Sequence, residues 1–192
     1  MYELVYQEND GKHVIPMMLE DNDKIFAYSF IDNCVAGMEG NERGYWRDVG
    51  TIDSYYEANM DLISVSPQLN LYNYSWPILT NQGNLPPAKT VFDDEGRRGQ
   101  NIDSLVCGGC ITSGSTVRRS ILGPSCKVHS YAVVEDSILF ENVQIGRNAK
   151  IKKAIIDENI SIPEGMSIGF DHEEDRMRVC IVTDSGIVVV TR

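Results

Sequence analysis

The second half of the chain repeats with a period of seventeen residues. Within one period, three series of large aliphatic residues are offset by six, six and five positions: Leu105, Leu122, Leu139 and Ile156; Ile111, Val128, Ile145 and Ile162; and Val117, Val134, Ile151 and Ile168. Self-similarity of this kind is typical of a solenoid, in which each coil buries its apolar face only against neighbouring coils. Three short strands per coil, each with one large aliphatic, predict a mainly β protein with a parallel β-helix of triangular section.

Small residues repeat two positions before two of these series. The Val117 series is preceded by Ser115, Ala132, Ala149 and Met166, and the Leu105 series is preceded by Ser120, Ser137 and Ala154. Side chains two apart on a strand share a face, so we expect both sets to point inward. The adjacent pairs Ile121–Leu122, Ile138–Leu139 and Ile155–Ile156 leave open which member of each faces the core.

The predicted outward positions carry charge that alternates in sign from coil to coil. One column is Arg118, Glu135 and Lys152, and the next is Arg119, Asp136 and Lys153. Coils stacked about 4.8 Å apart bring these charges together, which favours surface ion pairing worth roughly 0–1 kcal/mol per pair. An anion site is the alternative interpretation, because Arg147 and Lys150 lie nearby in the sequence.

Composition argues against several classes of partner. The net charge of −11 repels the phosphates of DNA, RNA and anionic membranes. The sequence contains neither an apolar stretch long enough to span a membrane nor a leader with a basic start and an apolar middle. We therefore expect a cytoplasmic protein with no nucleic-acid or membrane partner.

The five cysteines are scattered, which indicates a reducing compartment. Cys107-Gly-Gly-Cys110 has CxxC spacing, but a zinc site needs a second pair of ligands and a redox CxxC normally opens a helix. The histidines at positions 13, 129 and 172 have no partner at metal-ligand spacing. The cysteines are interpreted as structural residues.

The first hundred residues differ in kind from the repeat. Residues 24–31 alternate weakly and predict one strand, whereas residues 52–63 keep apolar side chains at helical spacing after Thr51, a plausible N-cap. One strand and one helix cannot form a core of their own. We therefore expect this portion to be the end of a larger α/β domain.

These patterns predict three parts. Residues 1–65 are the C-terminal remnant of the larger domain, 66–103 are a linker rich in Asn, Pro and Gly, and 104–192 are the β-helix domain. Within the last part, residues 178–192 predict a hairpin that covers the end of the solenoid. The acidic residues 172–175 before it are interpreted as a solvated connector.

Several motifs occur in the order in which one enzyme family carries them. They are Tyr45-Trp46-Arg47-Asp48-Val49-Gly50-Thr51, Asn59-Met60-Asp61-Leu62, Leu85-Pro86-Pro87-Ala88-Lys89, Gly96-Arg97-Arg98-Gly99, Ser104-Leu105-Val106, Ile162-Pro163-Glu164-Gly165 and Val188-Val189-Val190-Thr191-Arg192. From about Gly11 onward, the chain resembles the C-terminal part of bacterial glucose-1-phosphate adenylyltransferase, also called ADP-glucose pyrophosphorylase. That family makes ADP-glucose and pyrophosphate from ATP and glucose 1-phosphate for glycogen or starch synthesis.

The resemblance implies a nucleotidyltransferase domain followed by a left-handed β-helix, a homotetramer, and regulation by phosphorylated metabolites and nucleotides. It places Asp48 as a substrate-binding and metal carboxylate for Mg²⁺, and Trp46 at the sugar subsite. The alternatives are a turn carboxylate before Gly50 that helps to cap the following helix, and ordinary core packing for Trp46.

Parts of the family's catalytic machinery do not occur in this sequence. They are the Gly-rich nucleotide loop, the other metal carboxylate and the sugar-phosphate lysine, so no catalytic set is complete and we expect the isolated chain to be inactive. Where the family has Asp-Phe-Gly-Lys-Asp, this chain has Asn9-Asp10-Gly11-Lys12-His13. The change in the two leading residues argues against sugar binding through Asn9 or Asp10.

The resemblance also implies an effector site between the two domains. Glu158 occupies a position where the family has a basic residue. The candidate regulatory residues are therefore Lys152 and Lys153, together with Arg97 and Arg98, which are otherwise solvated loop charges.

Two other functions remain open from the sequence. In a hexapeptide-repeat acyltransferase, His129 would be the general base. In a non-catalytic assembly subunit, the exposed strands of the β-helix would only build an oligomer.

Overall fold

The structure is a computed structural model that describes the chain except for residues 1–9, 39, 82, 179 and 192. Asn9 of the sugar-subsite motif and Val179 and Arg192 of the predicted hairpin therefore lie outside the described residues. The chain divides into two compact units, Met1–Cys34 and Val35–Arg192.

The regular structure described in the first unit is helical and short, with an irregular segment between its helices. A π-helical turn, η1 (Asp10–Val14), continues into α1 (Ile15–Glu20), and η2 (Phe30–Asp32) is a 3-10 turn. The strand predicted over residues 24–31 is wrong, because none of the sheets formed by the described residues includes this segment. A strand persists only when its N–H and C=O groups pair with a neighbour, and here alternation alone was a misleading signal.

The second unit begins with the short turn η3 (Gly40–Glu42) and the helix α2 (Ile52–Asp61). Thr51 is the N-cap, as predicted. Its hydroxyl accepts from the N–H of Ser54 at 3.1 Å, and the Ser54 hydroxyl accepts from the N–H of Thr51 at 3.1 Å. This reciprocal pair satisfies two N–H groups that would otherwise lack a partner at the start of the helix.

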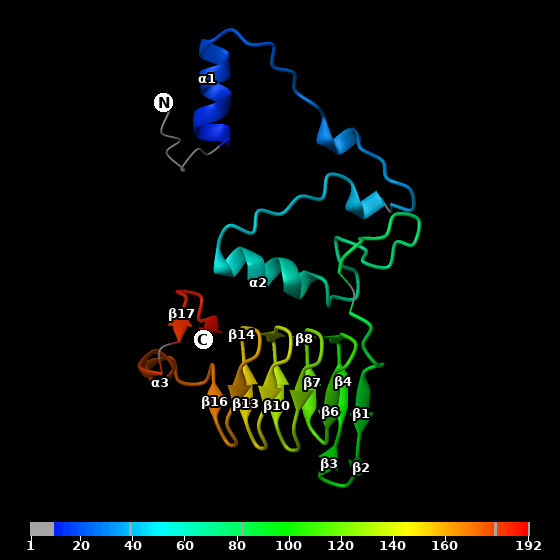
Figure 1. Cartoon of the computed structure of the whole chain (residues 1–192), viewed down its shortest axis with the longest axis vertical. Coiled ribbons are helices and arrows are strands. Elements are labelled where there is room, and N and C mark those ends of the chain that lie inside the picture. Colours follow the sequence, from blue (N-terminus) through cyan, green and yellow to red (C-terminus); the bar gives the residue numbers. More distant parts are fainter. Residues whose placement is uncertain (1–9, 39, 82, 179, 192) are drawn as a thin grey trace. The chain divides into compact units, whose positions relative to one another are not determined.

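The rest of the unit is a parallel β-helix with three sheets, as the seventeen-residue period predicts (Figure 1). One sheet contains β1 (Lys89–Val91), β6 (Ile111–Ser113), β9 (Lys127–Val128), β12 (Gln144–Ile145) and β15 (Ser161–Ile162). The second contains β4 (Gln100–Ile102), β7 (Thr116–Arg118), β10 (Val133–Glu135), β13 (Lys150–Lys152) and β16 (Ser167–Ile168). The third contains β5 (Leu105–Val106), β8 (Ile121–Leu122), β11 (Ile138–Leu139), β14 (Ala154–Ile156), β17 (Ile181–Val182) and β18 (Val188–Val190).

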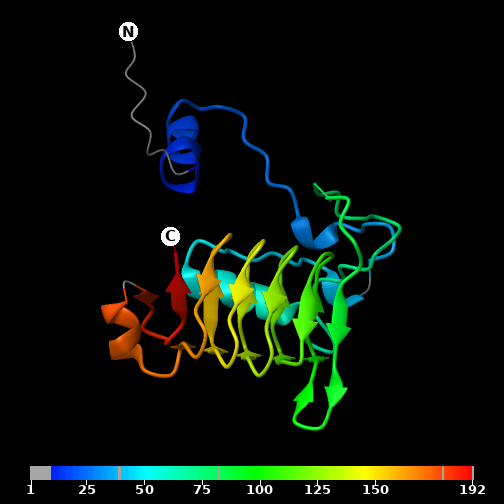
Figure 2. The ribbon, with the colours of Figure 1, turned by 60° about the horizontal axis from the view of Figure 1, so that its bottom comes forward.

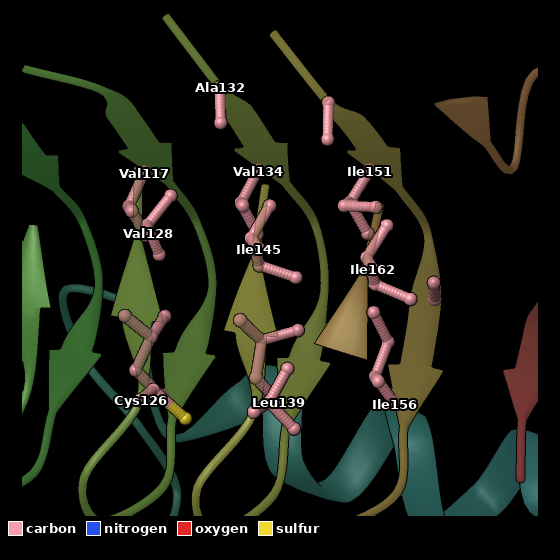
Figure 3. Packing of buried hydrophobic residues seen from close by; sticks show 14 of the residues in the cluster. Val117, Cys126, Val128, Ala132, Val134, Leu139, Ile145, Ile151, Ile156 and Ile162 are labelled. Carbon is pink, nitrogen blue, oxygen red and sulfur yellow. The ribbon is translucent and has the colours of Figure 1, made fainter. Parts of the chain in front are cut away.

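From the second coil onward, the predicted aliphatic columns line the interior (Figure 3). Each member is at most 4% exposed: Val117, Val134, Ile151 and Ile168; Val128, Ile145 and Ile162; and Leu122, Leu139 and Ile156. The small residues that precede them are buried as predicted, with Met166 partly buried against the same core. Burying each large side chain contributes about 1.5–3 kcal/mol, so the columns hold the stack together.

The first coil departs from the predicted register by one residue. Leu105 and Ile111 were predicted to face inward, but the residues in register with the buried columns are their neighbours, in the pairs Val106–Leu122 and Thr112–Val128. The cause is a shorter corner between Thr112 and Val117, formed around Gly114 with φ of +57°. A slip of one residue exchanges the two faces of a strand.

The slip gives the N-terminal end of the core a polar lining. The Thr112 hydroxyl donates to Asn101 Oδ1 at 2.9 Å, and Asn101 Nδ2 donates to the Thr90 hydroxyl at 2.8 Å. A terminal coil has no further coil to cover it, so hydrogen-bonded side chains suit this position.

Serine side chains connect successive coils at one corner of the β-helix, and two of them, Ser120 and Ser137, are fully buried. Ser104, Ser120 and Ser137 each donate to the carbonyl two residues earlier, at 2.7, 2.8 and 2.6 Å. Each also accepts from the backbone N–H of the equivalent residue one coil later, at 3.1, 3.1 and 3.2 Å. The last of these donors is Ala154. The small inward residues therefore link the coils as well as fitting between them.

The C-terminal hairpin is present as predicted and completes the solenoid. β17 and β18 are antiparallel, β18 pairs in parallel with β14, and Val188 is fully buried in the core. The prediction of a solvated connector at residues 172–175 is wrong, because they begin the helix α3 (His172–Met177). Asp175 is 1% exposed and accepts from the N–H of Gly169 at 2.9 Å, so it satisfies a backbone donor at the end of the last coil.

Part of the predicted linker takes part in the sheets. β1 and β4 pair with β6 and β7, and between them the chain forms the antiparallel hairpin of β2 (Asp93–Asp94) and β3 (Arg97–Arg98). The boundaries 1–65, 66–103 and 104–192 stay a prediction. No helix in the described parts of the chain is long and apolar enough to cross a membrane.

The serine connections predict a measurable loss of stability in Ser137→Ala. The substitution leaves the buried N–H of Ala154 without its acceptor, and we expect the free energy of unfolding in urea to fall by about 1–3 kcal/mol. Ser161→Ala, at an exposed position on β15, is the matched control and should change it by less than about 0.5 kcal/mol. Equal effects of the two substitutions would contradict this interpretation.

Candidate functional site

Asp48 lies in an exposed turn just before α2. Its Oδ1 atom accepts from the N–H of Gly50 at 3.0 Å, which closes a short turn around Val49. The cap of α2 is supplied by Thr51 and Ser54, so capping is not the role of Asp48. The result is a carboxylate that is fixed in direction by one hydrogen bond and open to solvent.

Trp46 lies two residues earlier and is 73% exposed. Trp46 is therefore not packed in a core, which was the alternative interpretation of this residue. The turn places an exposed aromatic ring and an exposed carboxylate next to one another in sequence. Such a pair is suited to bind a ligand that has both a flat apolar face and oxygens that hold a metal.

The turn is held in place because α2 packs on the outside of the β-helix (Figure 2). The ambiguous aliphatic pairs explain how: Leu122, Leu139 and Ile156 face inward, and their neighbours form the outer surface beneath the helix. This second apolar cluster contains Ile121, Ile138, Ile155, Ile187, Phe140 and Val189 of the β-helix with Ile52, Tyr55, Tyr56 and Met60 of the helix.

Two aromatic side chains of α2 make directional contacts with the coils. Tyr56 donates its hydroxyl to the backbone carbonyl of Asp136 at 2.6 Å, and Tyr55 meets Phe140 edge to face with ring centroids 6.4 Å apart. No pattern in the sequence indicates the contact of Tyr56 with Asp136, because the two residues are 80 positions apart. These contacts fix the helix along the sheet.

An open, mainly apolar cavity of about 460 Å³ lies beside the Asp48 turn. It is lined by Val49, Gly50, Thr51, Ile52, Tyr55, Phe140, Ile155, Asp157, Val189 and Thr191. The start of α2 and the C-terminal end of the β-helix thus share one surface.

The four predicted regulatory residues lie in two separate places, on β3 and around the end of β13. Arg97 and Arg98 belong to β3, where Arg97 stacks its guanidinium 3.5 Å from the centre of the Phe92 ring and Arg98 pairs with Asp93. Lys152 is exposed at the end of β13, and Lys153 donates to the Ser185 carbonyl at 2.5 Å. The structure does not bring the arginines and the lysines together on one element.

The predicted charge columns are in register. Glu135 lies opposite both Arg118 and Lys152, and Arg119 forms a two-pronged ion pair with Asp136 at 2.6 and 2.9 Å. Because the pair is exposed, it adds little to stability. Its direct effect is to occupy one of the basic groups that could otherwise bind an anion.

The cysteines carry free thiols. Cys110 and Cys126 are buried in the core, and each donates to a backbone carbonyl at 3.0 Å. Burial, with a smaller contribution from Cys110, raises the pKa of Cys107 above its usual value, which disfavours the reactive thiolate. In the part of the chain that the structure describes, no three His, Cys, Asp or Glu side chains form a group that could hold a metal ion.

Comparison with known proteins agrees with this architecture. The profile of the family described as "GlmU-like, C-terminal hexapeptide" matches residues 86–190, and that of "Nucleotidyl transferase" matches residues 1–65. The chain is similar to proteins named glucose-1-phosphate adenylyltransferase. The identity is 74% for that of Geobacter metallireducens, over 94% of this chain and 44% of the relative. It is 72% for that of Trichlorobacter lovleyi, over 97% and 46%, and 46% for that of Nitrosomonas europaea, over 100% and 45%. The chain thus spans less than half the length of these relatives.

The contact of Tyr56 predicts a specific loss of stability at alkaline pH. Burial raises the pKa of Tyr56 to about 12, with Asp136 adding to the shift and Arg119 opposing it. An unfolded tyrosine titrates near pH 10, so the unfolded chain releases the phenol proton first. The stabilising contribution is therefore complete below about pH 10 and is lost as the pH rises towards 12.

We expect Tyr56→Phe to flatten the fall in the free energy of unfolding over that range, measured by urea unfolding at each pH. Tyr74→Phe, at a tyrosine that is 88% exposed, is the control and should keep the parental alkaline profile. If both variants keep that profile, the phenol of Tyr56 does not couple to folding.

Proposed function

Because the chain belongs to the GlmU-like C-terminal hexapeptide family, we propose that it forms the C-terminal portion of a glucose-1-phosphate adenylyltransferase. The reaction transfers AMP from ATP to glucose 1-phosphate and gives ADP-glucose and pyrophosphate, in the synthesis of glycogen. One observation carries the proposal. Relatives with that name are 74% and 72% identical over more than nine-tenths of this chain, across both the part before α2 and the β-helix.

The geometry supports a division of labour within such an enzyme. The segment with Trp46 and Asp48 leads directly into α2, and α2 is packed along the outer face of β8, β11 and β14. A rigid β-helix then serves as the support for one edge of the substrate site. Positioning of this kind is a large part of catalysis when negatively charged phosphates must be aligned.

Asp48 is the proposed metal carboxylate, and its environment suits that role. Mg²⁺ uses one or two protein carboxylates together with substrate oxygens and water. An exposed carboxylate with one oxygen held by Gly50 provides such a ligand. When bound, the ion neutralises the phosphate oxygens that come together during the transfer. Trp46 is the proposed contact to the sugar, because its exposed ring can cover an apolar face of the pyranose.

Regulation and assembly are further parts of the proposal. Among the candidate effector residues, Lys153 contacts the C-terminal hairpin and directly follows Lys152 in the chain, and Arg98 adjoins a cavity of about 300 Å³ at the β2–β3 hairpin. Phosphorylated metabolites are the proposed ligands, because a lysine ammonium or an arginine guanidinium binds phosphate well. The assembled enzyme is proposed to be a cytoplasmic homo-oligomer.

The activity can be tested with a chimera. We expect the purified 192-residue chain to release no pyrophosphate from ATP and glucose 1-phosphate. The Geobacter metallireducens relative, with its matching 181-residue segment replaced by this chain, should have a kcat within about tenfold of that relative. A chimera that is folded but inactive would overturn the proposed function, and activity of the chain alone would overturn the predicted dependence on a further domain.

The role of Asp48 can be separated from its role in the turn. Asp48→Asn keeps an oxygen that can accept from Gly50 but removes the charge that a metal needs. In the chimera we expect kcat/KM to fall at least about a hundredfold and the KM for Mg²⁺ to rise. Glu57→Gln, at an exposed position on α2, is the matched control. If Asp48→Asn behaves like this control, Asp48 is only a turn residue.

A further inference from the structure

Asp53, near the start of α2, is bound to the far end of the chain. Its Oδ1 atom accepts from the hydroxyl of Ser185 and from that of Thr183, the latter at 3.4 Å. The two hydroxyls are themselves 2.9 Å apart. Residues 130 and 132 positions away in sequence therefore converge on one carboxylate oxygen in the first turn of the helix.

The hairpin that supplies these hydroxyls is firmly attached to the last coils. The Ser185 carbonyl accepts from Lys153 Nζ at 2.5 Å, and the N–H of Val188 donates to the Lys153 carbonyl at 3.1 Å. Within the turn, Thr183 Oγ1 accepts from the N–H of Ile187 at 3.1 Å. Ile187 is 2% exposed and packs in the cluster beneath α2. The hairpin is therefore fixed to the last coils, and it positions the two hydroxyl groups that donate to Asp53.

Asp53 lies only five positions after Asp48. Asp48 is bonded to Gly50, Thr51 and Ser54 cap the helix, and Asp53 follows directly after Ile52. The hydrogen bonds of Asp48 and of the Thr51–Ser54 cap are local to the segment, so they set its internal shape but not its position on the β-helix. The contact of Asp53 with Ser185 and Thr183 connects the segment to the hairpin.

We propose that Asp53 is a positioning residue, held by Ser185 and Thr183 of the C-terminal hairpin, that fixes the Asp48 turn relative to the β-helix. This inference rests on the proposed function for the role of Asp48 in metal binding. In this proposal the hairpin both completes the solenoid and holds Asp53. Lys153 takes part because its ammonium donates to the Ser185 carbonyl. A ligand that binds this ammonium and removes that hydrogen bond would therefore weaken the support of Asp53.

A simpler role for Asp53 is a favourable negative charge at a helix N-terminus. The two roles are separable, because Ser185→Ala removes a hydroxyl donor while leaving the Asp53 charge in place. Asp53→Ala removes both the acceptor and the charge, and alanine raises the intrinsic helix propensity. Loosening of the segment in both variants therefore cannot come from propensity, and in Ser185→Ala it cannot come from a lost charge.

The first measurement is amide hydrogen exchange on the 192-residue chain. In Asp53→Ala and in Ser185→Ala, we expect amides of residues 48–56 to exchange about tenfold faster, because the attached segment opens more often. Amides of β10 and β13 should keep their parental rates. Glu57→Ala on the same helix is the control and should leave residues 48–56 unchanged. Faster exchange confined to residues 180–190 would overturn the proposal, because Asp53 would then stabilise only the hairpin.

The second measurement uses the active chimera. Both variants should raise the KM for Mg²⁺ by about tenfold, whereas a merely structural role would lower the yield of folded enzyme without changing that constant. An unchanged KM for Mg²⁺ in an active chimera would overturn the proposed positioning of Asp48. If the unsubstituted chimera is inactive, the proposed function fails instead, and the exchange rates alone decide whether Asp53 holds the turn.

Discussion

The narrow interior of the coil stack is the constraint on which the rest of the structure depends. Each side of a coil buries one large aliphatic, two of the three sides mostly pair it with a small residue two positions earlier, and parallel pairing places like residues directly above one another. The buried serines exploit this stacking, since a hydroxyl in one coil reaches a backbone N–H in the next. Regular spacing is therefore required both for packing and for hydrogen bonding.

The same regularity creates the surface on which α2 lies. In the third sheet, strands with two adjacent aliphatics bury one inside the coil and present the other outside. Repeated over Ile121, Ile138 and Ile155, this gives an apolar strip that a solenoid would not otherwise expose. Because α2 covers that strip, the turn with Asp48 is tied to the coils rather than to a flexible linker.

Prediction from the sequence succeeded where a repeated pattern carried the information. The columns from Val117 onward, the cap at Thr51 and the final hairpin were all predictable, since each depends on spacing or on a local residue preference. The first coil was misread because one short corner at Gly114 shifts its register, and a single local change has no periodic signature. The buried Asp175 and the contact of Asp53 with Ser185 were not predictable, because both depend on how remote segments meet.

Asp53 connects the helix α2 to the C-terminal hairpin of the β-helix. A solenoid is stabilised mainly by neighbouring coils, so a disturbance at one end is not expected to spread far along the stack. The Asp48 turn is supported at several coils through α2 and at the terminal hairpin through Asp53, so its position does not depend on such transmission. Because α2 packs against several coils, all of them help to hold the Asp48 turn in place. A small shift of the hairpin then acts at the polar contact of Asp53, while the apolar contacts further along α2 and the hydrogen bond of Tyr56 to Asp136 remain in place.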